Sequence, residues 1–109
     1  MSEKRIAVFA GTFDPITLGH VDIVKRGLSL FDEIIVAIGH NSSKQGFFPL
    51  EKREDWIKKI FKDESKVQVK SYEGLTINFC KSVNAKFILR GLRDGKDFEY
   101  ERSLGMMNH

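Results

Sequence analysis

The sequence predicts an α/β fold in which a parallel sheet is covered by helices on both faces. Residues 6–9, 33–39 and 87–89 form mostly apolar runs, typical of strands buried in the middle of a sheet. Residues 67–71 alternate between apolar and polar side chains, which indicates a fourth strand at an edge. Between these runs, apolar residues recur at helical spacing. A regular alternation of strand and helix is typical of parallel sheets with right-handed crossovers.

Four helices are expected to accompany these strands. The first begins near Gly19 or His20, and the second covers residues 50–61. The third runs through residues 76–83, and a last helix begins at about Asp97. The 109 residues therefore predict one domain, residues 1–109, with no linker or repeat.

The composition restricts the class of protein. The net charge is +3, but the lysines and arginines are dispersed among acids, so we expect no nucleic-acid partner. No apolar run approaches the roughly 20 residues that span a bilayer, and the N-terminus lacks a signal peptide, so we expect no membrane partner and a cytoplasmic location. Cys80 is the only cysteine, which excludes an internal disulfide and favours a small buried side chain.

The segment from Ala10 to His20 joins the first strand to the first helix. Gly11 allows a close backbone approach, Thr12 adds a hydroxyl, and His20 lies in the first helical turn. The first turn of a helix has unpaired N–H groups and the positive end of its dipole, both of which favour an anion. Taken singly, each residue is better explained as part of an ordinary turn or helix start. Their combination at a strand–turn–helix junction predicts a phosphate site, although neither GxxxxGK[ST] nor GxGxxG is present.

Cations follow two other predicted strands. Lys44 follows residues 33–39, and Arg90 and Arg93 follow residues 87–89. Ligands of open α/β sheets bind at the carboxyl ends of the strands, and guanidinium groups bind phosphate oxygens in pairs. With Thr12 and His20, this set contains donors and cations but no nucleophile with its base, and the sequence has no metal-binding motif. It favours phosphoryl or nucleotidyl transfer, and a nucleotide-binding module without chemistry is the alternative.

Three motifs carry a resemblance to a known family. Thr17-Leu18-Gly19-His20 resembles the (T/H)xGH signature of the nucleotidyltransferase superfamily. Within that superfamily, residues 90–93 (RGLR) and 97–101 (DFEYE) resemble the phosphopantetheine adenylyltransferases of bacterial coenzyme A synthesis. The match is collinear from residue 6 to residue 108, and it implies a Rossmann-like, doubly wound sheet.

The resemblance implies a reaction and a site. The family transfers the adenylyl group of ATP to 4′-phosphopantetheine, giving dephospho-CoA and pyrophosphate with Mg²⁺, and it assembles as a homohexamer. By resemblance, His20, Lys44 and Arg93 are catalytic, and no residue binds the metal directly. Residues implied to bind the acceptor are Thr12, Lys44, Leu75, Thr76, Arg90, Leu104 and Asn108. Residues implied to bind ATP are Thr12, Phe13, His20, Gly91, Leu92, Arg93 and Glu101.

The chain ends at His109, whereas members of this family continue through a further strand and C-terminal helices. We therefore expect a truncated form in which the fourth strand is an exposed edge. We expect such a fragment to be weak or inactive by itself. A nucleotidyltransferase with another phosphorylated acceptor is the remaining alternative.

Overall fold

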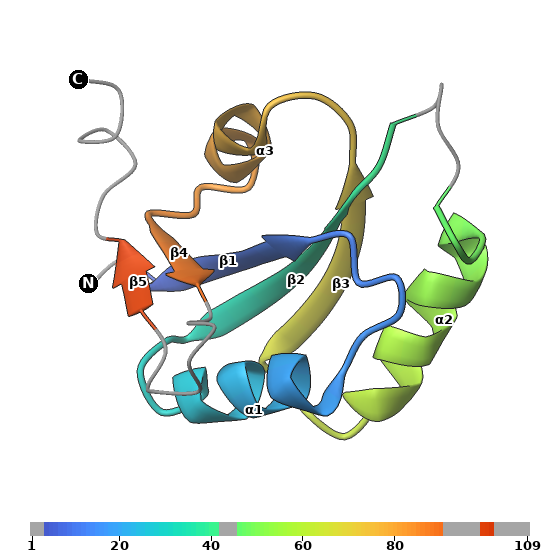
Figure 1. The fold of residues 1–109 in the computed structure, drawn as a ribbon. Helices are drawn as coiled ribbons and strands as arrows, with labels where there is room; N and C mark the ends of the chain where they lie inside the picture. The colour runs from blue at the N-terminus through green and yellow to red at the C-terminus, as the bar shows by residue number, and fades with distance from the viewer. Residues whose placement is uncertain (1–3, 42–45, 91–98, 102–109) are drawn as a thin grey trace.

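The computed structural model describes residues 4–41, 46–90 and 99–101, although the side chains of Arg90 and of residues 99–101 are not described. Its centre is a five-stranded sheet with the order β3-β2-β1-β4-β5 (Figure 1). The strands are β1 (Ile6–Gly11), β2 (Glu33–Gly39), β3 (Val67–Tyr72), β4 (Phe87–Arg90) and β5 (Glu99–Glu101). The first four are parallel to one another, as the sequence predicted, and β3 lies at one edge.

The expectation for residues 99–101 is wrong. They were expected to lie in a helix that begins at about Asp97, but they form the short strand β5, antiparallel to β4. Residues 97, 98 and 102–109 lie outside the described residues. The pairing of Leu89 with Tyr100 also corrects the expectation that β4 is an exposed edge. A strand edge presents unpaired N–H and C=O groups, and a nearby segment that pairs with it satisfies them.

Helices cover both faces of the sheet. The helices α1 (Leu18–Gly27) and α2 (Leu50–Ile60) lie on one face, and α3 (Thr76–Ser82) lies on the other (Figure 1). Each face has its own apolar core. On the first, Val24 and Ile57 pack with Ile34. On the second, Cys80 packs with Ile35 and is fully buried, which confirms the prediction for this cysteine.

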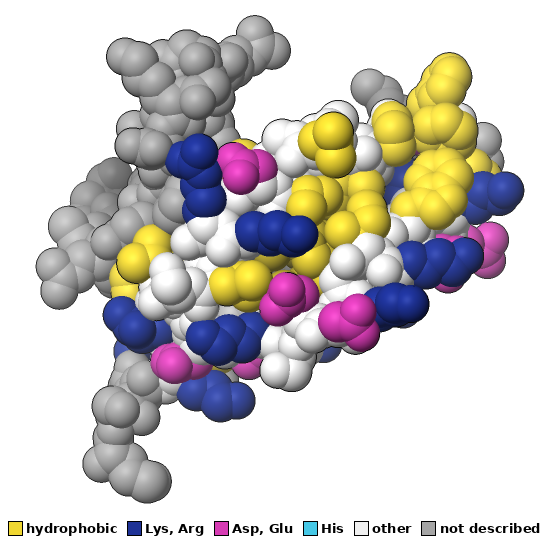
Figure 2. Space-filling model, turned by 90° about the horizontal axis from the view of Figure 1, so that it is seen from below, with side chains coloured by type: hydrophobic (Ala, Val, Ile, Leu, Met, Phe, Trp, Pro, Cys, Tyr) yellow, Lys and Arg dark blue, Asp and Glu magenta, His cyan; other side chains and the backbone are white. Residues whose placement is uncertain are grey.

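The face formed by α1 and α2 also exposes apolar side chains (Figure 2). Leu18 is 88% exposed and Phe47 is 83% exposed. Beside them lies a shallow groove of about 460 Å³. Trp56 is partly buried and lines this groove. Within the described ranges, none of the helices has the length and apolar character needed to cross a bilayer.

Candidate active site

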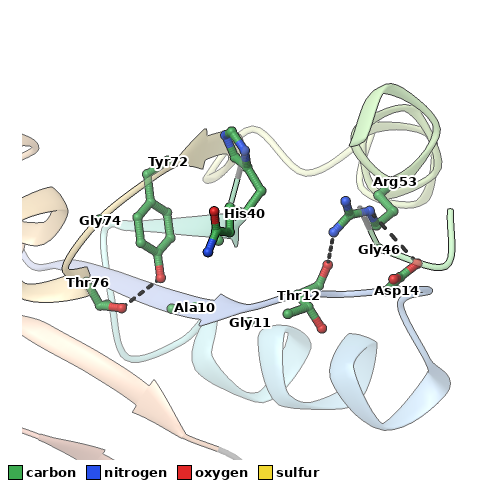
Figure 3. Close-up of a pocket in the computed structure, with 12 residues that line it drawn as sticks. Ala10, Gly11, Thr12, Asp14, His40, Gly46, Arg53, Tyr72, Gly74 and Thr76 are labelled. Atoms are coloured by element: carbon green, nitrogen blue, oxygen red, sulfur yellow. Dashed lines mark hydrogen bonds and ion pairs between the residues drawn. The ribbon is translucent and has the colours of Figure 1, made fainter. Parts of the chain in front are cut away.

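A cavity of about 550 Å³ opens where β1, β2 and β3 end (Figure 3). The residues that line it come from these strand ends and from the loops that follow them. They are Ala10, Gly11, Thr12, Asp14, Gly39, His40, Asn41, Gly46, Arg53, Tyr72, Gly74 and Thr76. The chain passes from β1 to β2 and β3 on one side, and then returns to place β4 on the other side of β1. The carboxyl end of β1 is therefore a topological switch point, where α/β sheets bind their ligands.

The turn after β1 is shaped by Phe13. Its backbone has φ of +47°, in the left-handed region, and its ring is 2% exposed. The ring folds back beneath Gly11, so that a Cβ atom at position 11 would lie 3.3 Å from Phe13 Cζ. A glycine therefore suits this position because the ring occupies the space of a side chain. The exposed side chain of Thr12 remains at the rim of the cavity.

His20 is part of the cap of helix α1. Thr17 is the N-cap residue, and its hydroxyl accepts a hydrogen bond from the backbone N–H of His20 at 3.3 Å. In return, the backbone N–H of Thr17 donates to Nδ1 of His20 at 3.0 Å. A backbone N–H can only donate, so Nδ1 must accept and the proton of the neutral ring lies on Nε2. The fold therefore presents His20 as a neutral donor.

The surroundings of the imidazole favour the same neutral state. Its ring packs edge-on against Phe13 at a centroid distance of 4.9 Å and against Phe9 at 5.9 Å. Partial burial lowers the pKa of His20 below its ordinary value because it disfavours the charged form. His20 is not among the described residues that line the cavity. The ring of Phe13 connects the two, because it packs against His20 and also fills the space beside Gly11, which does line the cavity.

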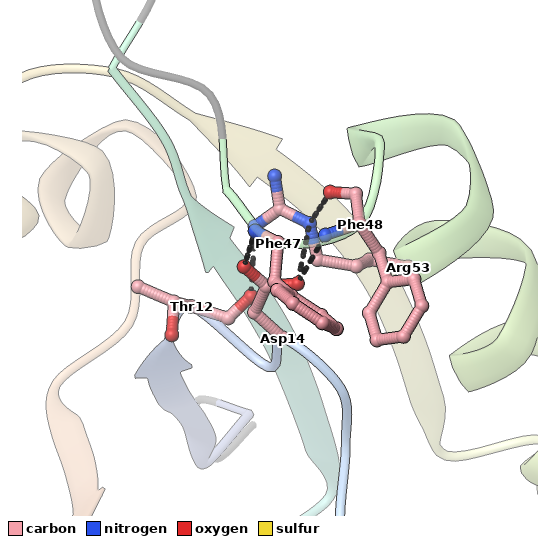
Figure 4. A network of polar contacts seen from close by, with 5 residues as sticks. All are labelled: Thr12, Asp14, Phe47, Phe48 and Arg53. Atoms are coloured by element: carbon pink, nitrogen blue, oxygen red, sulfur yellow. Dashed lines mark hydrogen bonds and ion pairs between the residues drawn. The ribbon is translucent and has the colours of Figure 1, made fainter.

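One end of the cavity is held by Asp14 and Arg53 (Figure 4). The carboxylate of Asp14 accepts hydrogen bonds from the backbone N–H groups of Phe47 and Phe48. Arg53 donates to the carbonyl oxygens of Phe48 and Thr12, each at 3.0 Å. Its Nε atom also lies 3.9 Å from Asp14 Oδ1. These contacts join the turn after β1 to the segment that precedes α2.

The other end of the cavity is formed by β3 and α3. The hydroxyls of Tyr72 and Thr76 are 2.7 Å apart and share a hydrogen bond (Figure 3). A Cβ atom at Gly39 would lie 3.1 Å from the Tyr72 hydroxyl, so the glycine leaves room for this pair. Leu75, at the start of α3, is 67% exposed.

The predicted site residues fall into three groups. In the first group, Thr12 and Thr76 line one cavity, Phe13 packs against Gly11, Leu75 is adjacent to Thr76, and His20 lies in the cap of α1 outside the described lining. Arg90 ends β4 and Glu101 ends β5, but only their backbones are described. The other predicted positions, Lys44, Gly91, Leu92, Arg93, Leu104 and Asn108, lie outside the described residues. The convergence of Lys44, Arg90 and Arg93 on the cavity stays a prediction.

Sequence reasoning missed Asp14, Arg53 and Tyr72. In the sequence, Asp14 precedes Pro15, a pair typical of a turn, and Arg53 lies on the apolar face of its predicted helix. That position was itself a signal, because a charge on a core-facing side of a helix requires a polar partner. Tyr72 falls one residue past the predicted strand and carried no comparable signal.

The described residues do not form a protein-held metal site. No group of three or more His, Cys, Asp or Glu side chains converges anywhere in residues 4–41, 46–90 and 99–101. Asp14 already accepts two amide hydrogen bonds and faces a guanidinium, so it is poorly placed to hold a cation.

Comparison with known proteins agrees with this geometry. The model of the cytidylyltransferase-like family matches residues 8–108. A phosphopantetheine adenylyltransferase of Christiangramia forsetii is 61% identical over 94% of this chain and 68% of its own length. The Flavobacterium psychrophilum protein of the same name is 58% identical over 95% of this chain and 69% of its own length.

Among solved structures, a lipopolysaccharide core biosynthesis protein from Thermoplasma volcanium shares the fold, with a TM-score of 0.63 and 21% identity. The superposition covers 87% of this chain and 80% of that one. The family match, the identity to these relatives and the fold lead to one conclusion: the chain belongs to the cytidylyltransferase-like nucleotidyltransferases and, within them, to the phosphopantetheine adenylyltransferase family.

Proposed function

We propose that this protein transfers the adenylyl group of ATP to 4′-phosphopantetheine, giving dephospho-CoA and pyrophosphate. The observation that carries the proposal is the identity to relatives named for this activity, 61% for one of them. The cavity at the carboxyl ends of β1, β2 and β3 supports it, because its rim offers the hydroxyls of Thr12 and Thr76. The acceptor phosphate attacks the α-phosphorus of ATP. A bond from its oxygen to this phosphorus forms, and the bond to the bridging oxygen of pyrophosphate breaks.

In this reaction the chain acts by binding and by stabilising charge. A phosphate oxygen is already a nucleophile, so no general base is needed. His20 donates from Nε2 to the ATP phosphates, since Nδ1 is engaged by the backbone of Thr17. Neutral donors of fixed orientation stabilise the charge that develops on the transferred phosphoryl group without needing to reorganise.

The remaining roles follow the family resemblance. Lys44 and Arg93 act with His20 on the phosphates. Thr12, Leu75, Thr76, Arg90, Leu104 and Asn108 hold the acceptor with Lys44. Phe13, Gly91, Leu92, Arg93 and Glu101 hold ATP with Thr12 and His20.

Three further features belong to the same proposal. Mg²⁺ is brought by the triphosphate of ATP, and removing it with a chelator should stop product formation until Mg²⁺ is restored. The active assembly is a homo-oligomer, a hexamer by resemblance, which light scattering on the purified protein would measure. The proposed location is the cytoplasm.

The direct test is turnover by the 109-residue chain with ATP and 4′-phosphopantetheine, at a rate expected to be lower than that of the longer Christiangramia forsetii protein. Pyrophosphate release and the mass of dephospho-CoA should appear together, and nicotinamide mononucleotide or glycerol 3-phosphate should not replace the acceptor. ATP binding without pyrophosphate release would instead indicate a nucleotide-binding fragment.

A variant tests the role of the imidazole. His20→Ala should lower the rate by at least about tenfold, equivalent to ~1.4 kcal/mol of transition-state stabilisation. The control is Asp55→Asn, which removes an exposed ion pair with Lys59 on α2 and should leave the rate unchanged. A smaller effect of His20→Ala would contradict the role given to this residue.

A further inference from the structure

Arg53 is the only charged side chain in the buried core of the described residues. It is 5% exposed, whereas the other described charged residues are all at least partly exposed. A guanidinium is costly to bury unless its donors are satisfied and its charge is paired. Its retention inside the molecule therefore calls for a specific explanation.

The contacts of Arg53 connect two distant parts of the chain. Nη1 donates to the carbonyl oxygen of Thr12 and Nε donates to that of Phe48, each at 3.0 Å. Both acceptors are main-chain atoms, so the side chain fixes backbone positions rather than other side chains. Hydrogen bonds from a charged donor are about twice as strong as neutral ones.

Asp14 completes the connection from the opposite direction. Its two oxygens accept from the successive backbone N–H groups of Phe47 and Phe48, the second at 2.7 Å. Asp14 thus belongs to the turn after β1 but holds the segment before α2, whereas Arg53 belongs to α2 but holds the turn (Figure 4). The two residues bind each other's segments reciprocally.

Gly46 shows how closely the parts fit. A Cβ atom there would overlap Asp14 Oδ2 and lie 3.2 Å from Arg53 Nη2. Both neighbours are held by their own hydrogen bonds, so neither can move away at no cost. The segment approaches the pair to a distance that only glycine permits.

We propose that Asp14 and Arg53 are positioning residues, which hold the turn that carries Thr12 in place for the reacting phosphates. Neither needs to touch a substrate. The link to the reaction rests on the proposed function, because that function places both reactants at Thr12. The tie between the two segments is a property of the fold and can be measured separately.

The first measurement follows amide hydrogen exchange in the intact chain. Asp14→Asn keeps the size of the side chain but replaces one acceptor oxygen by a donor, so one of the two amides at Phe47 and Phe48 loses its partner. We expect the exchange of that amide to accelerate at least tenfold. Arg53→Lys should accelerate exchange at residues 11–13, because an ammonium group cannot reproduce the fork that reaches both carbonyls. Asp55→Asn, the matched control on α2, should change neither.

The second measurement is steady-state turnover well below the melting temperature of every variant. Asp14→Asn should lower kcat/KM for 4′-phosphopantetheine at least tenfold. Arg53→Lys should retain at least tenfold more activity than Arg53→Met, since it keeps the charge beside Asp14. The double variant Asp14→Asn with Arg53→Lys should have a kcat/KM within about twofold of the less active single variant, because the two residues act as one unit. If Arg53→Met does not fold, Gly46→Ala disturbs the same pair from the segment before α2. It should lower kcat/KM as much as Asp14→Asn does.

Each outcome decides the proposal. Unchanged exchange in Asp14→Asn and Arg53→Lys would overturn the tie. Faster exchange with kcat/KM within threefold of the unsubstituted chain would overturn the positioning role. If the unsubstituted chain itself shows no turnover, the proposed function fails for this chain, while the exchange results still support or overturn the tie.

Discussion

The cap of helix α1 leads to a prediction that separates stability from catalysis. Thr17→Val keeps the shape of the side chain but removes the hydroxyl that accepts from the backbone N–H of His20. The hydroxyl also lies 3.2 Å from Nδ1 of His20, but the shorter hydrogen bond to the same atom, donated by the backbone N–H of Thr17 at 3.0 Å, does not depend on the side chain. The substitution should therefore weaken the helix while leaving the imidazole oriented.

The size of the loss follows from the cap itself. Removing the side chain of a threonine N-cap costs about 1 kcal/mol, within a range of roughly 0.5–2 kcal/mol. For a domain of this size, each kcal/mol corresponds to about 4–8 °C in melting temperature. Thr17→Ser retains the acceptor and should stay within about 2 °C of the unsubstituted protein, on the same scale.

Thermal unfolding by circular dichroism measures the stability, and pyrophosphate release measures the activity. We expect Thr17→Val to melt several degrees below Thr17→Ser while the two differ less than threefold in kcat. Equal melting temperatures would show that the hydroxyl does not cap the helix. A large loss of kcat with unchanged melting would show that the hydroxyl, and not the backbone, orients the ring.

Three further predictions concern packing and pH. Gly27→Ala should destabilise the fold by about 1–3 kcal/mol in denaturant unfolding, because the new Cβ would lie 3.1 Å from Ile34 Cδ1. Gly19→Ala, whose Cβ would meet nothing closer than 3.7 Å, is its control and should cost less than half as much. Ile57→Ala removes a fully buried side chain and should cost about 2–5 kcal/mol in the same measurement, and a loss below 1 kcal/mol would contradict its place in the core. Burial lowers the pKa of His20 in the folded state below its ordinary value of 6.5. The neutral imidazole therefore contributes to stability above pH 6.5, and this contribution is lost as the pH falls from that value towards the lower pKa of the folded state. Melting temperatures should accordingly fall less between pH 7.5 and pH 5 in His20→Gln than in the unsubstituted protein, and equal slopes would refute the assignment.

The parallel part of the fold was predictable because its strands are short apolar runs separated by helical periodicity. The predicted strands at residues 6–9 and 33–39 correspond to β1 and β2, and the alternation at residues 67–71 correctly placed β3 at an edge. Strand β5 was not predictable in this way. Its three residues form a strand by pairing with β4, and a strand that depends on such pairing leaves no periodic trace in so short a stretch.

The candidate site was predictable to a similar extent. The junction from Gly11 to His20 was recognised from local features, and the structure places Thr12 at a cavity and His20 at a helix cap. The partnership of Asp14 with the amides before α2 was not recognised. A carboxylate that accepts from backbone groups far along the chain depends on the fold, because main-chain amides have no sequence signature.

The central position of β1 has a consequence for how the chain acquires its structure. Among the described strands β1 is synthesised first, and β2 can pair with it as soon as the intervening helix has been made. Its opposite side must wait for Phe87, the residue that pairs with Ala7. One side of β1 therefore stays unpaired until β4 has been made, and loss of residues 6–11 would divide the finished sheet instead of shortening it at an edge.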